Sequence, residues 1–249
     1  MSMRGTVAGL AVTALLVLTA GAGNASIISP RAMKGGCNPP PPPPMPPASE
    51  FVDRVDNAYF PLEPGTVYTY RGQEEGDQVL DTVTVTAATK TILGVGATVV
   101  LDVVEVNGHP SEKTFDWYAQ DRDGNVWYLG ESAFEYVNGQ WVRADDSWRA
   151  GLDGARPGLI MEAHGKAGDT YTQEDYPGHA EDMAQVVSTH ATVSVRYGTF
   201  HHALKTMECT PLEPGVIDVK YHARGIGEVR EATVRGGSAE LELVSVEHR

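Results

Sequence analysis

The sequence predicts an all-β protein in which an antiparallel meander forms a barrel or half-barrel. Its apolar residues follow a period of two, as in residues 81–87, where Val83 and Val85 alternate with threonines. Tight turns separate the apolar segments, and no long segment shows the 3.6-residue period of a helix. About a dozen short strands joined mostly by hairpins favour an up-and-down meander over Greek-key crossings.

Segments of strand character follow one another along the chain. Residues 97–106 are almost continuously apolar, which indicates a central strand. This segment ends at Asn107-Gly108, a residue pair preferred in two-residue hairpins, and a second such pair stands at Asn138-Gly139. The other strands are expected at residues 112–119, 125–131, 134–137, 140–143, 191–197, 202–209, 216–223, 227–234 and 239–246.

The N-terminal fifth of the chain has a different composition. Residues 1–25 combine Arg4 with an uncharged apolar run from Val7 to Ala20 and then small residues, the pattern of a secretory signal peptide. The run is shorter than the ~20 apolar residues of a membrane helix, so we expect no transmembrane anchor. Residues 26–50 contain six consecutive prolines and are predicted to be a polyproline spacer. Residues 51–249 remain for a single β-barrel-like domain, secreted or held in the cell envelope.

The net charge and the cysteine count restrict the partners and the compartment. A formal charge of −14 argues against nucleic acid and anionic membranes, which select basic patches. Cationic ligands, divalent ions or simple solubility remain as explanations. The two cysteines, Cys37 and Cys209, either form a disulfide in an oxidising compartment or remain as two thiols, and their spacing does not decide between these alternatives.

One short sequence occurs twice. Pro-Leu-Glu-Pro-Gly stands at residues 61–65 and again at residues 211–215, each time before a predicted strand. Proline sets an extended approach and glycine permits a turn. Nothing else repeats at this offset, so we interpret the two copies as the same strand-entry turn and not as a duplicated half-domain.

Four segments carry a resemblance to known proteins: FPLEPGTVYTY (60–70), DWYAQDRDGNVWYLGE (116–131), PGHAEDMAQV (177–186) and YHARGIGEVRE (221–231). They resemble a family of exported bacterial β-rich proteins without an assigned activity, over most of residues 57–246. The last strands of the chain, which include residues 195–200 and 221–231, are also similar in shape to the closing strands of lipocalin-like and lipoprotein-carrier half-barrels. The resemblance implies a fold and a compartment but no reaction. An apolar residue often stands in that family where this chain has His179, which implies no family-wide role for His179.

The acidic turn DRDGN, residues 121–125, is interpreted as a hairpin and not as a calcium loop. Asp121, Asp123 and Asn125 alternate as in calcium loops, but the bidentate acid required about seven residues later is missing, since Glu131 lies too far along. Asp-Gly flanked by Asn is ordinary hairpin chemistry.

The segment QEDYPGHAEDMAQV, residues 173–186, is the candidate metal or acid/base site. His179, Glu181 and Asp182 are candidate ligands for one divalent metal ion, although no HxH, HExxH or CxxC motif accompanies them. The carboxylates of Glu174 and Glu181 are alternatively an acid/base pair, or the segment is only a solvated acidic edge. If the chain is extended here, Glu181 and Asp182 point to opposite sides, and the inward carboxylate needs a partner.

Aromatic hairpins indicate a ligand pocket. Trp117 and Trp127, together with Glu131 and Glu174, are the candidate ligand-binding residues of a barrel interior. No Gly-x-Ser-x-Gly elbow and no phosphate-binding glycine loop occurs. The leading hypothesis is an exported, non-catalytic β-barrel that binds a small apolar or cationic ligand. The alternatives are a metal-binding protein or metal-dependent enzyme that uses His179 and Glu181, and a structural or adhesive module that contacts a cell-envelope component.

Overall fold

The structure, a computed structural model, describes residues 36–249, and the predicted signal peptide lies outside the described residues. The described chain forms one 14-stranded antiparallel sheet and a small two-stranded sheet. The one helical element in residues 36–249 is a single 3₁₀ turn, and no described helix is long and apolar enough to cross a membrane.

The elements follow in chain order as η1 (Ala48–Glu50), β1 (Phe51–Val52), β2 (Val55–Asn57), β3 (Phe60–Leu62), β4 (Thr66–Glu74), β5 (Asp77–Ile92), β6 (Val95–Val106), β7 (His109–Asp121), β8 (Val126–Val137), β9 (Gln140–Arg143), β10 (Gly158–Met161), β11 (Thr170–Thr172), β12 (Met183–Val195), β13 (Gly198–Cys209), β14 (Ile217–Ala223), β15 (Gly227–Arg235) and β16 (Ala239–His248).

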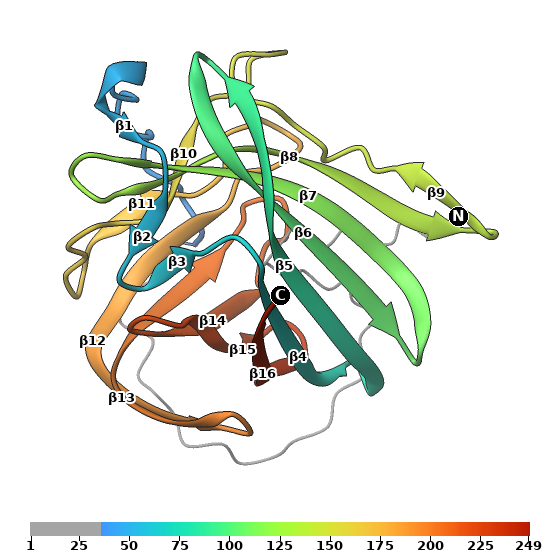
Figure 1. Cartoon of the computed structure of the whole chain (residues 1–249). Coiled ribbons are helices and arrows are strands. Elements are labelled where there is room, and N and C mark those ends of the chain that lie inside the picture. The colour runs from blue at the N-terminus through green and yellow to red at the C-terminus, as the bar shows by residue number, and fades with distance from the viewer. Residues whose placement is uncertain (1–35) are drawn as a thin grey trace.

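The main sheet is an antiparallel meander, as predicted. Its strand order is β10-β8-β7-β6-β5-β4-β16-β15-β14-β13-β12-β11, so nearly all neighbours in space are neighbours in the chain. The two runs of hairpins join where the last strand, β16, pairs with β4, with Leu243 opposite Tyr70. Figure 1 shows the strands wrapping around a common interior, with β4 to β8 forming one wall and β12 to β16 the other.

The two edges of the sheet meet without a continuous ladder between them. An isolated antiparallel bridge joins Arg156 to Asp175, and the Arg156 amide donates to the Asp175 carbonyl at 2.9 Å. At Gly158, the first residue of β10, an added Cβ would lie 2.1 Å from the Gln173 carbonyl oxygen. Only glycine therefore allows the β10 edge to approach the segment that follows β11 so closely. The main sheet thus curves into a barrel or half-barrel, and its hydrogen-bonded ladder is not closed between β10 and β11.

The turns have the predicted chemistry. Asn107 and Gly108 have φ angles of 52° and 76°, and Asn138 and Gly139 have φ angles of 52° and 84°. Two consecutive positive φ values are the mark of the I′ hairpin, which matches the right-handed twist of the flanking strands. In the DRDGN turn, Asp121 accepts hydrogen bonds from the backbone and the side-chain amide of Asn125. Asp121 is therefore part of a hairpin, as interpreted from the sequence.

Both copies of Pro-Leu-Glu-Pro-Gly are strand-entry turns. The Thr66 amide donates to the Glu63 carbonyl at 3.1 Å, and the Val216 amide donates to the Glu213 carbonyl at 3.2 Å. Each turn ends on a glycine with positive φ, 92° at residue 65 and 106° at residue 215. The common sequence therefore produces a common turn before β4 and before β14.

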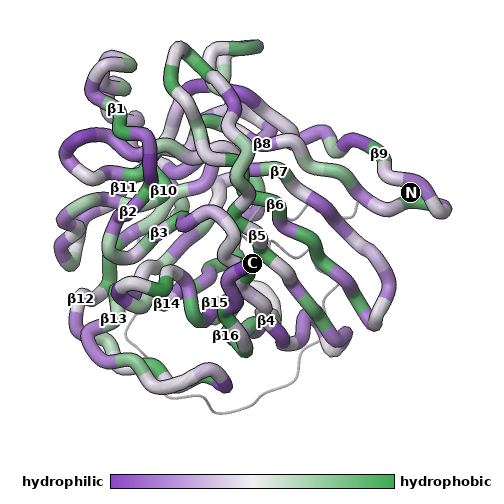
Figure 2. The backbone as a smooth tube through the Cα atoms, viewed as in Figure 1, coloured by the Kyte–Doolittle hydropathy of each residue, from purple (hydrophilic) through white to green (hydrophobic). Residues whose placement is uncertain are grey.

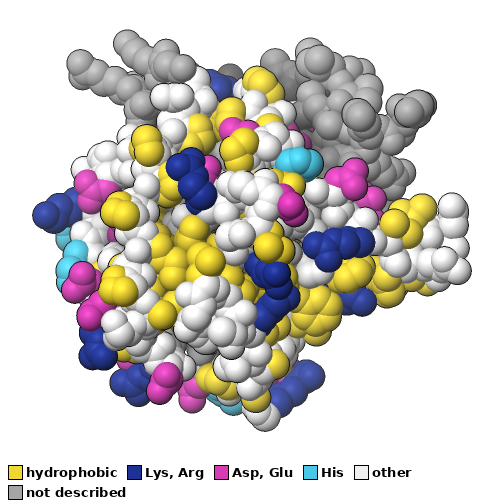
Figure 3. All heavy atoms as spheres, turned by 90° about the horizontal axis from the view of Figure 1, so that it is seen from above, with side chains coloured by type: hydrophobic (Ala, Val, Ile, Leu, Met, Phe, Trp, Pro, Cys, Tyr) yellow, Lys and Arg dark blue, Asp and Glu magenta, His cyan; other side chains and the backbone are white. Residues whose placement is uncertain are grey.

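The period of two places one face of each strand inside. In the first half of β5 the buried side chains are Val79, Asp81, Val83 and Val85, and the residues between them are more exposed. Figure 2 shows this alternation of hydropathy along the strands of the right-hand wall. The inward face carries carboxyl groups as well as valines. On the face seen in Figure 3, Asp, Glu, Lys and Arg side chains stand dispersed around hydrophobic side chains, so this face shows no concentrated acidic patch.

The described part of the predicted spacer, residues 36–50, lies against the domain. Cys37 and Cys209 form a disulfide, which settles the alternative that the sequence left open. Three residues further on, the Pro40 carbonyl accepts a hydrogen bond from the Thr172 hydroxyl. The segment is thus tied both to the end of β13 and to β11. The boundaries of the signal peptide, spacer and domain stay predictions.

We expect the disulfide to contribute strongly to stability. It joins residues 172 positions apart in the sequence and so restricts the unfolded chain. The double variant Cys37→Ser/Cys209→Ser should lower the free energy of unfolding by about 2–5 kcal/mol. Denaturant unfolding measures this change, and reduction of the unaltered protein serves as the control. An unchanged denaturation midpoint in both experiments would contradict the expected constraint.

Candidate functional site

A cavity of about 190 Å³ opens at one end of the interior, between β8 and the segments that follow β9, β11 and β13. Its lining brings together most of the acidic residues that the sequence singled out, and none of the described residues that line it is Lys or Arg. The lining residues are Glu131, Asp146, Glu174, His179, Ala180, Glu181, Asp182, Thr210, Leu212 and Glu213.

Glu131 is placed in the cavity wall by an irregularity in β8. The preceding Gly130 has a φ of 125°, and an added Cβ there would lie 2.4 Å from the Trp148 carbonyl oxygen. The Glu131 amide donates to that same carbonyl at 2.9 Å, so the loop containing Trp148 is held closely against β8. Glu131 is fully buried. Burial, and then the charge of the nearby Asp116, raise the pKa of the Glu131 carboxyl well above its ordinary value.

Tyr128 lies between two buried carboxyl groups. Its hydroxyl is 2.6 Å from Asp116 Oδ1 and 2.8 Å from Glu131 Oε2. A phenol has one proton to donate, so one of the two carboxyl groups must be protonated and donate to the phenol oxygen. Burial raises the pKa of Asp116 to about 8, while the hydrogen bond from Tyr128 opposes that rise. The two carboxyl groups of Asp116 and Glu131 therefore retain a shared proton beside Tyr128 at neutral pH.

Glu174 and Asp182 form a second proton-sharing pair. The backbone amides of Gln173 and Glu174 both donate to the Asp182 carbonyl, at 2.7 and 3.2 Å, and this brings the two segments together. The two carboxyl groups are hydrogen bonded to each other, which requires a proton on one of them. Burial, and then the Asp182 charge, raise the pKa of the Glu174 carboxyl well above its ordinary value. Burial also raises the pKa of Asp182.

Glu181 and Asp182 have different environments, in keeping with the alternation expected for an extended chain. The Glu181 carboxylate accepts a hydrogen bond from the Gly178 amide within the acidic turn. The Asp182 carboxyl instead faces Glu174. A basic group, a hydroxyl or a metal ion was expected beside the inward carboxylate, and the structure places the Thr210 hydroxyl there together with a second carboxyl group, that of Glu174.

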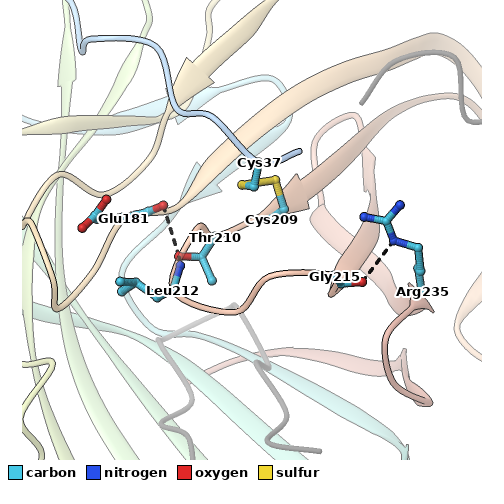
Figure 4. Close-up of a disulfide and its surroundings, with 7 residues drawn as sticks. All are labelled: Cys37, Glu181, Cys209, Thr210, Leu212, Gly215 and Arg235. Carbon is cyan, nitrogen blue, oxygen red and sulfur yellow. Dashed lines mark hydrogen bonds between the residues drawn. A yellow bond between two sulfur atoms is a disulfide. The ribbon is translucent and has the colours of Figure 1, made fainter. Parts of the chain in front are cut away.

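The rim of the cavity is formed by exposed or half-exposed residues. His179 is exposed and stacks on Tyr176, with ring centroids 4.3 Å apart. The hydroxyl of the buried Thr210 donates to the Glu181 carbonyl at 3.2 Å and links this segment to the one that follows β13 (Figure 4). Glu213 follows in the strand-entry turn, and partial burial raises its pKa to about 7. Glu213 therefore changes charge near neutral pH.

Deeper in the interior stands a lysine surrounded by acids. Lys220 Nζ lies 3.4 Å from a Glu208 oxygen and 3.8 Å from oxygens of Glu228 and Glu231. Burial by itself lowers the pKa of Lys220, but the surrounding carboxyl groups raise it well above its ordinary value, so the ammonium remains charged. The neighbouring His222 is buried with no hydrogen-bond partner for either ring nitrogen, and burial lowers its pKa to about 4.

The two predicted tryptophans do not line the cavity. Trp117 is buried in the hydrophobic core with the Lys90 ammonium 3.4 Å from its ring centroid. Trp127 is also in the core, and its indole nitrogen donates to Asp121 at 2.8 Å. Of the other predicted residues, Glu131, Glu174, His179, Glu181 and Asp182 all line it.

Sequence reasoning missed Asp146, Thr210 and Glu213. Thr210 follows a disulfide cysteine, and Glu213 lies in the repeated strand-entry turn, so both stood next to recognised features. Asp146 lies in a loop without a motif. Nothing in the local sequence indicated that these loops meet residues 174–182.

Metal binding by His179, Glu181 and Asp182 stays a prediction. Within residues 36–249 no group of three or more His, Cys, Asp and Glu side chains converges as metal ligands would. Carboxyl groups line the cavity from several segments of the chain, and some of them share protons.

Comparisons with known proteins add little. No family model and no curated protein matches the chain. A solved structure described as a "putative lipoprotein" from Parabacteroides distasonis ATCC 8503 is similar with a TM-score of 0.44 and 13% sequence identity, covering 79% of this chain and 100% of its own. A likeness this distant shows nothing about activity.

We expect stability to fall as the pH rises through neutrality. Carboxyl groups with raised pKa values hold protons in the folded protein that the unfolded chain releases, among them Asp218 at about 6, Glu228 at about 7 and Asp116 at about 8. Their contribution is fully present below the ordinary carboxyl pKa and is lost as pH rises through these values. Burial lowers the pKa of His222 to about 4, so His222 makes the free energy of unfolding fall as the pH decreases below the ordinary histidine pKa. The free energy of unfolding should therefore be larger at about pH 6 than at about pH 8.

Two neighbouring variants separate this effect from a general charge effect. Asp182→Asn should reduce the difference in unfolding free energy between the two pH values, because it removes the charge that, after burial, raises the pKa of Glu174. Glu181→Gln should leave the difference unchanged. A free energy of unfolding that rises from about pH 6 to about pH 8 would contradict the proton sharing.

Proposed function

We propose that this protein is an exported, non-catalytic binding protein for a small cationic ligand, held in the acidic cavity. The observation that carries the proposal is the lining itself, in which six carboxyl-bearing residues surround about 190 Å³ and no Lys or Arg stands among them. Charge of one sign focused in a concave site attracts counter-charged ligands. The ligand is smaller than drug-sized molecules, since their pockets span about 300–1,000 Å³.

The cation is favoured over an apolar ligand by the chemistry of the lining. Ala180 and Leu212 are its hydrophobic members, and Leu212 is exposed. An apolar ligand would bury carboxyl groups without offering them hydrogen-bond donors, which costs free energy. A positively charged ligand offers both donors and compensating charge.

Binding of an organic cation is favoured over metal-dependent catalysis by geometry. A divalent ion needs several ligand atoms converging at about 2.0–2.6 Å, and the described side chains do not converge in that way. Glu174 and Asp182 are instead hydrogen bonded to each other. A hydrogen-bonded cation tolerates separate carboxyl groups more readily than metal coordination does.

Export is supported by two independent features. The N-terminal sequence has the composition of a signal peptide. The disulfide between Cys37 and Cys209 fits an oxidising compartment, where such bonds form and persist. A role in contacting a cell-envelope component remains the alternative, and it would use the outer surface and not the cavity.

Ligand-dependent thermal stability tests the proposal. Small organic cations should raise the melting temperature of the protein in a concentration-dependent way, whereas anions of similar size should not. Glu213→Gln should weaken cation binding by a factor of about 2–5, because a partly exposed ion pair contributes about 0.5–1 kcal/mol.

The chain contains a matched control for this variant. Glu63 occupies the same position in the other Pro-Leu-Glu-Pro-Gly turn but is exposed and outside the cavity lining. Glu63→Gln should leave cation binding unchanged. Equal stabilisation by cations and anions, or equal effects of the two variants, would refute a cation site in this cavity.

A further inference from the structure

The interior already contains a site for one primary ammonium group, and its occupant is Lys220. The Lys220 ammonium is surrounded by oxygens from three carboxyl-bearing residues on neighbouring strands, at 3.4, 3.8 and 3.8 Å. The side chains are almost completely buried, at 4–9% exposure on the acids and 5% on the lysine. An ammonium has three rotatable N–H donors, so it suits oxygens that come from separate groups.

The cavity has a comparable set of acids and no lysine in its lining, and the charge of Lys220 is the smallest of the influences on the pKa of Asp182. Glu131, Glu174 and Asp182 line its wall, and no Lys or Arg is among the described lining residues. Glu174 is only 3% exposed, and no hydrogen-bond donor among residues 36–249 reaches its Oε2 atom. A buried carboxyl oxygen without a donor is costly, and a ligand that carries N–H groups would relieve that cost.

Two other classes of cation fit the lining less well. A quaternary ammonium ion has no N–H donors and is typically bound by aromatic faces. The lining contains no Phe, Tyr or Trp, and its single aromatic ring, His179, is exposed and stacked on Tyr176. A guanidinium ion prefers both oxygens of one carboxylate. Glu174 and Asp182 are hydrogen bonded to each other, which occupies part of each carboxyl group.

We propose that the ligand is a small primary amine whose ammonium group is held among Glu131, Glu174 and Asp182 in the way that the interior holds Lys220. This inference rests on the proposed function and specifies its ligand class. The half-exposed Glu181 and Glu213 at the rim attract the cation on entry. The bound ammonium replaces the proton that Glu174 and Asp182 share, so binding releases protons into solution.

Isothermal titration of the disulfide-bonded protein with three chloride salts tests the inference. The probes are butylammonium, tetramethylammonium and calcium. Butylammonium should bind at least about tenfold more tightly than tetramethylammonium. Glu174→Gln, which is nearly isosteric and can donate to Asp182, should weaken butylammonium binding about tenfold or more, and Glu63→Gln should not. The heat of butylammonium binding should depend on the ionisation enthalpy of the buffer, because protons are released.

The outcomes separate failure of this inference from failure of the proposed function. Equal affinities for butylammonium and tetramethylammonium, or binding of calcium alone, would overturn the primary-amine assignment and leave a cation site. Absence of binding by all three probes would overturn both. If Glu174→Gln fails to fold, Asp182→Asn is the second variant, and an unchanged butylammonium affinity in it would overturn the assignment.

Discussion

The constraint on which the rest of the structure depends is the burial of carboxyl groups inside a β-sheet wall. A lone buried charge costs several kcal/mol or more, so each inward acid needs a proton or a cation. The interior uses both solutions. Lys220 supplies a cation to Glu208, Glu228 and Glu231. Elsewhere protons are shared, between Asp81 and Asp102 and between other pairs of inward acids. In the cavity, buried acids such as Glu174 lie next to the half-exposed Glu181 and Glu213.

The N-terminal segment ties the two walls of the cavity together. Cys37 is bonded to Cys209, directly before Thr210 on one wall, and the Pro40 carbonyl accepts from Thr172, two residues before Glu174 on the other. Prolines between these points restrict the backbone, so the distance between the walls is held by a short and stiff connection. The spacer composition recognised in the sequence therefore has a structural role in residues 37–40. The N-terminal segment is therefore attached to the ends of β11 and β13, which lead directly into the cavity residues.

Local features of the fold could be predicted from the sequence because their causes are local. Alternating valines and threonines specify a half-buried strand, and Asn138-Gly139 specifies a hairpin because few other residue pairs accept two positive φ values. The acidic segment that contains His179 and Glu181 was recognised for the same reason, since its composition is unusual over a few residues.

The assembly of the site could not be predicted, because it depends on contacts between distant residues. Asp146 and Glu213 meet residues 174–182 only after the sheet has curved and its edges have come together. Pairing of the two cysteines also depends on that curvature. The tryptophans were assigned to a ligand because aromatic side chains commonly line pockets. In the structure Trp127 is directed into the core, where a turn residue, Asp121, satisfies its indole N–H.

The central claim is that the free cavity holds shared protons which a cationic ligand displaces. Carbon-detected nuclear magnetic resonance of the Glu174 and Asp182 carboxyl groups, followed as a function of pH, tests it most directly. The account predicts that in the free protein burial and the Asp182 charge keep the pKa of Glu174 well above its ordinary value, and that a bound primary amine shifts its titration to lower pH. Titration of both carboxyl groups near the ordinary value of about 4 in the free protein would contradict it.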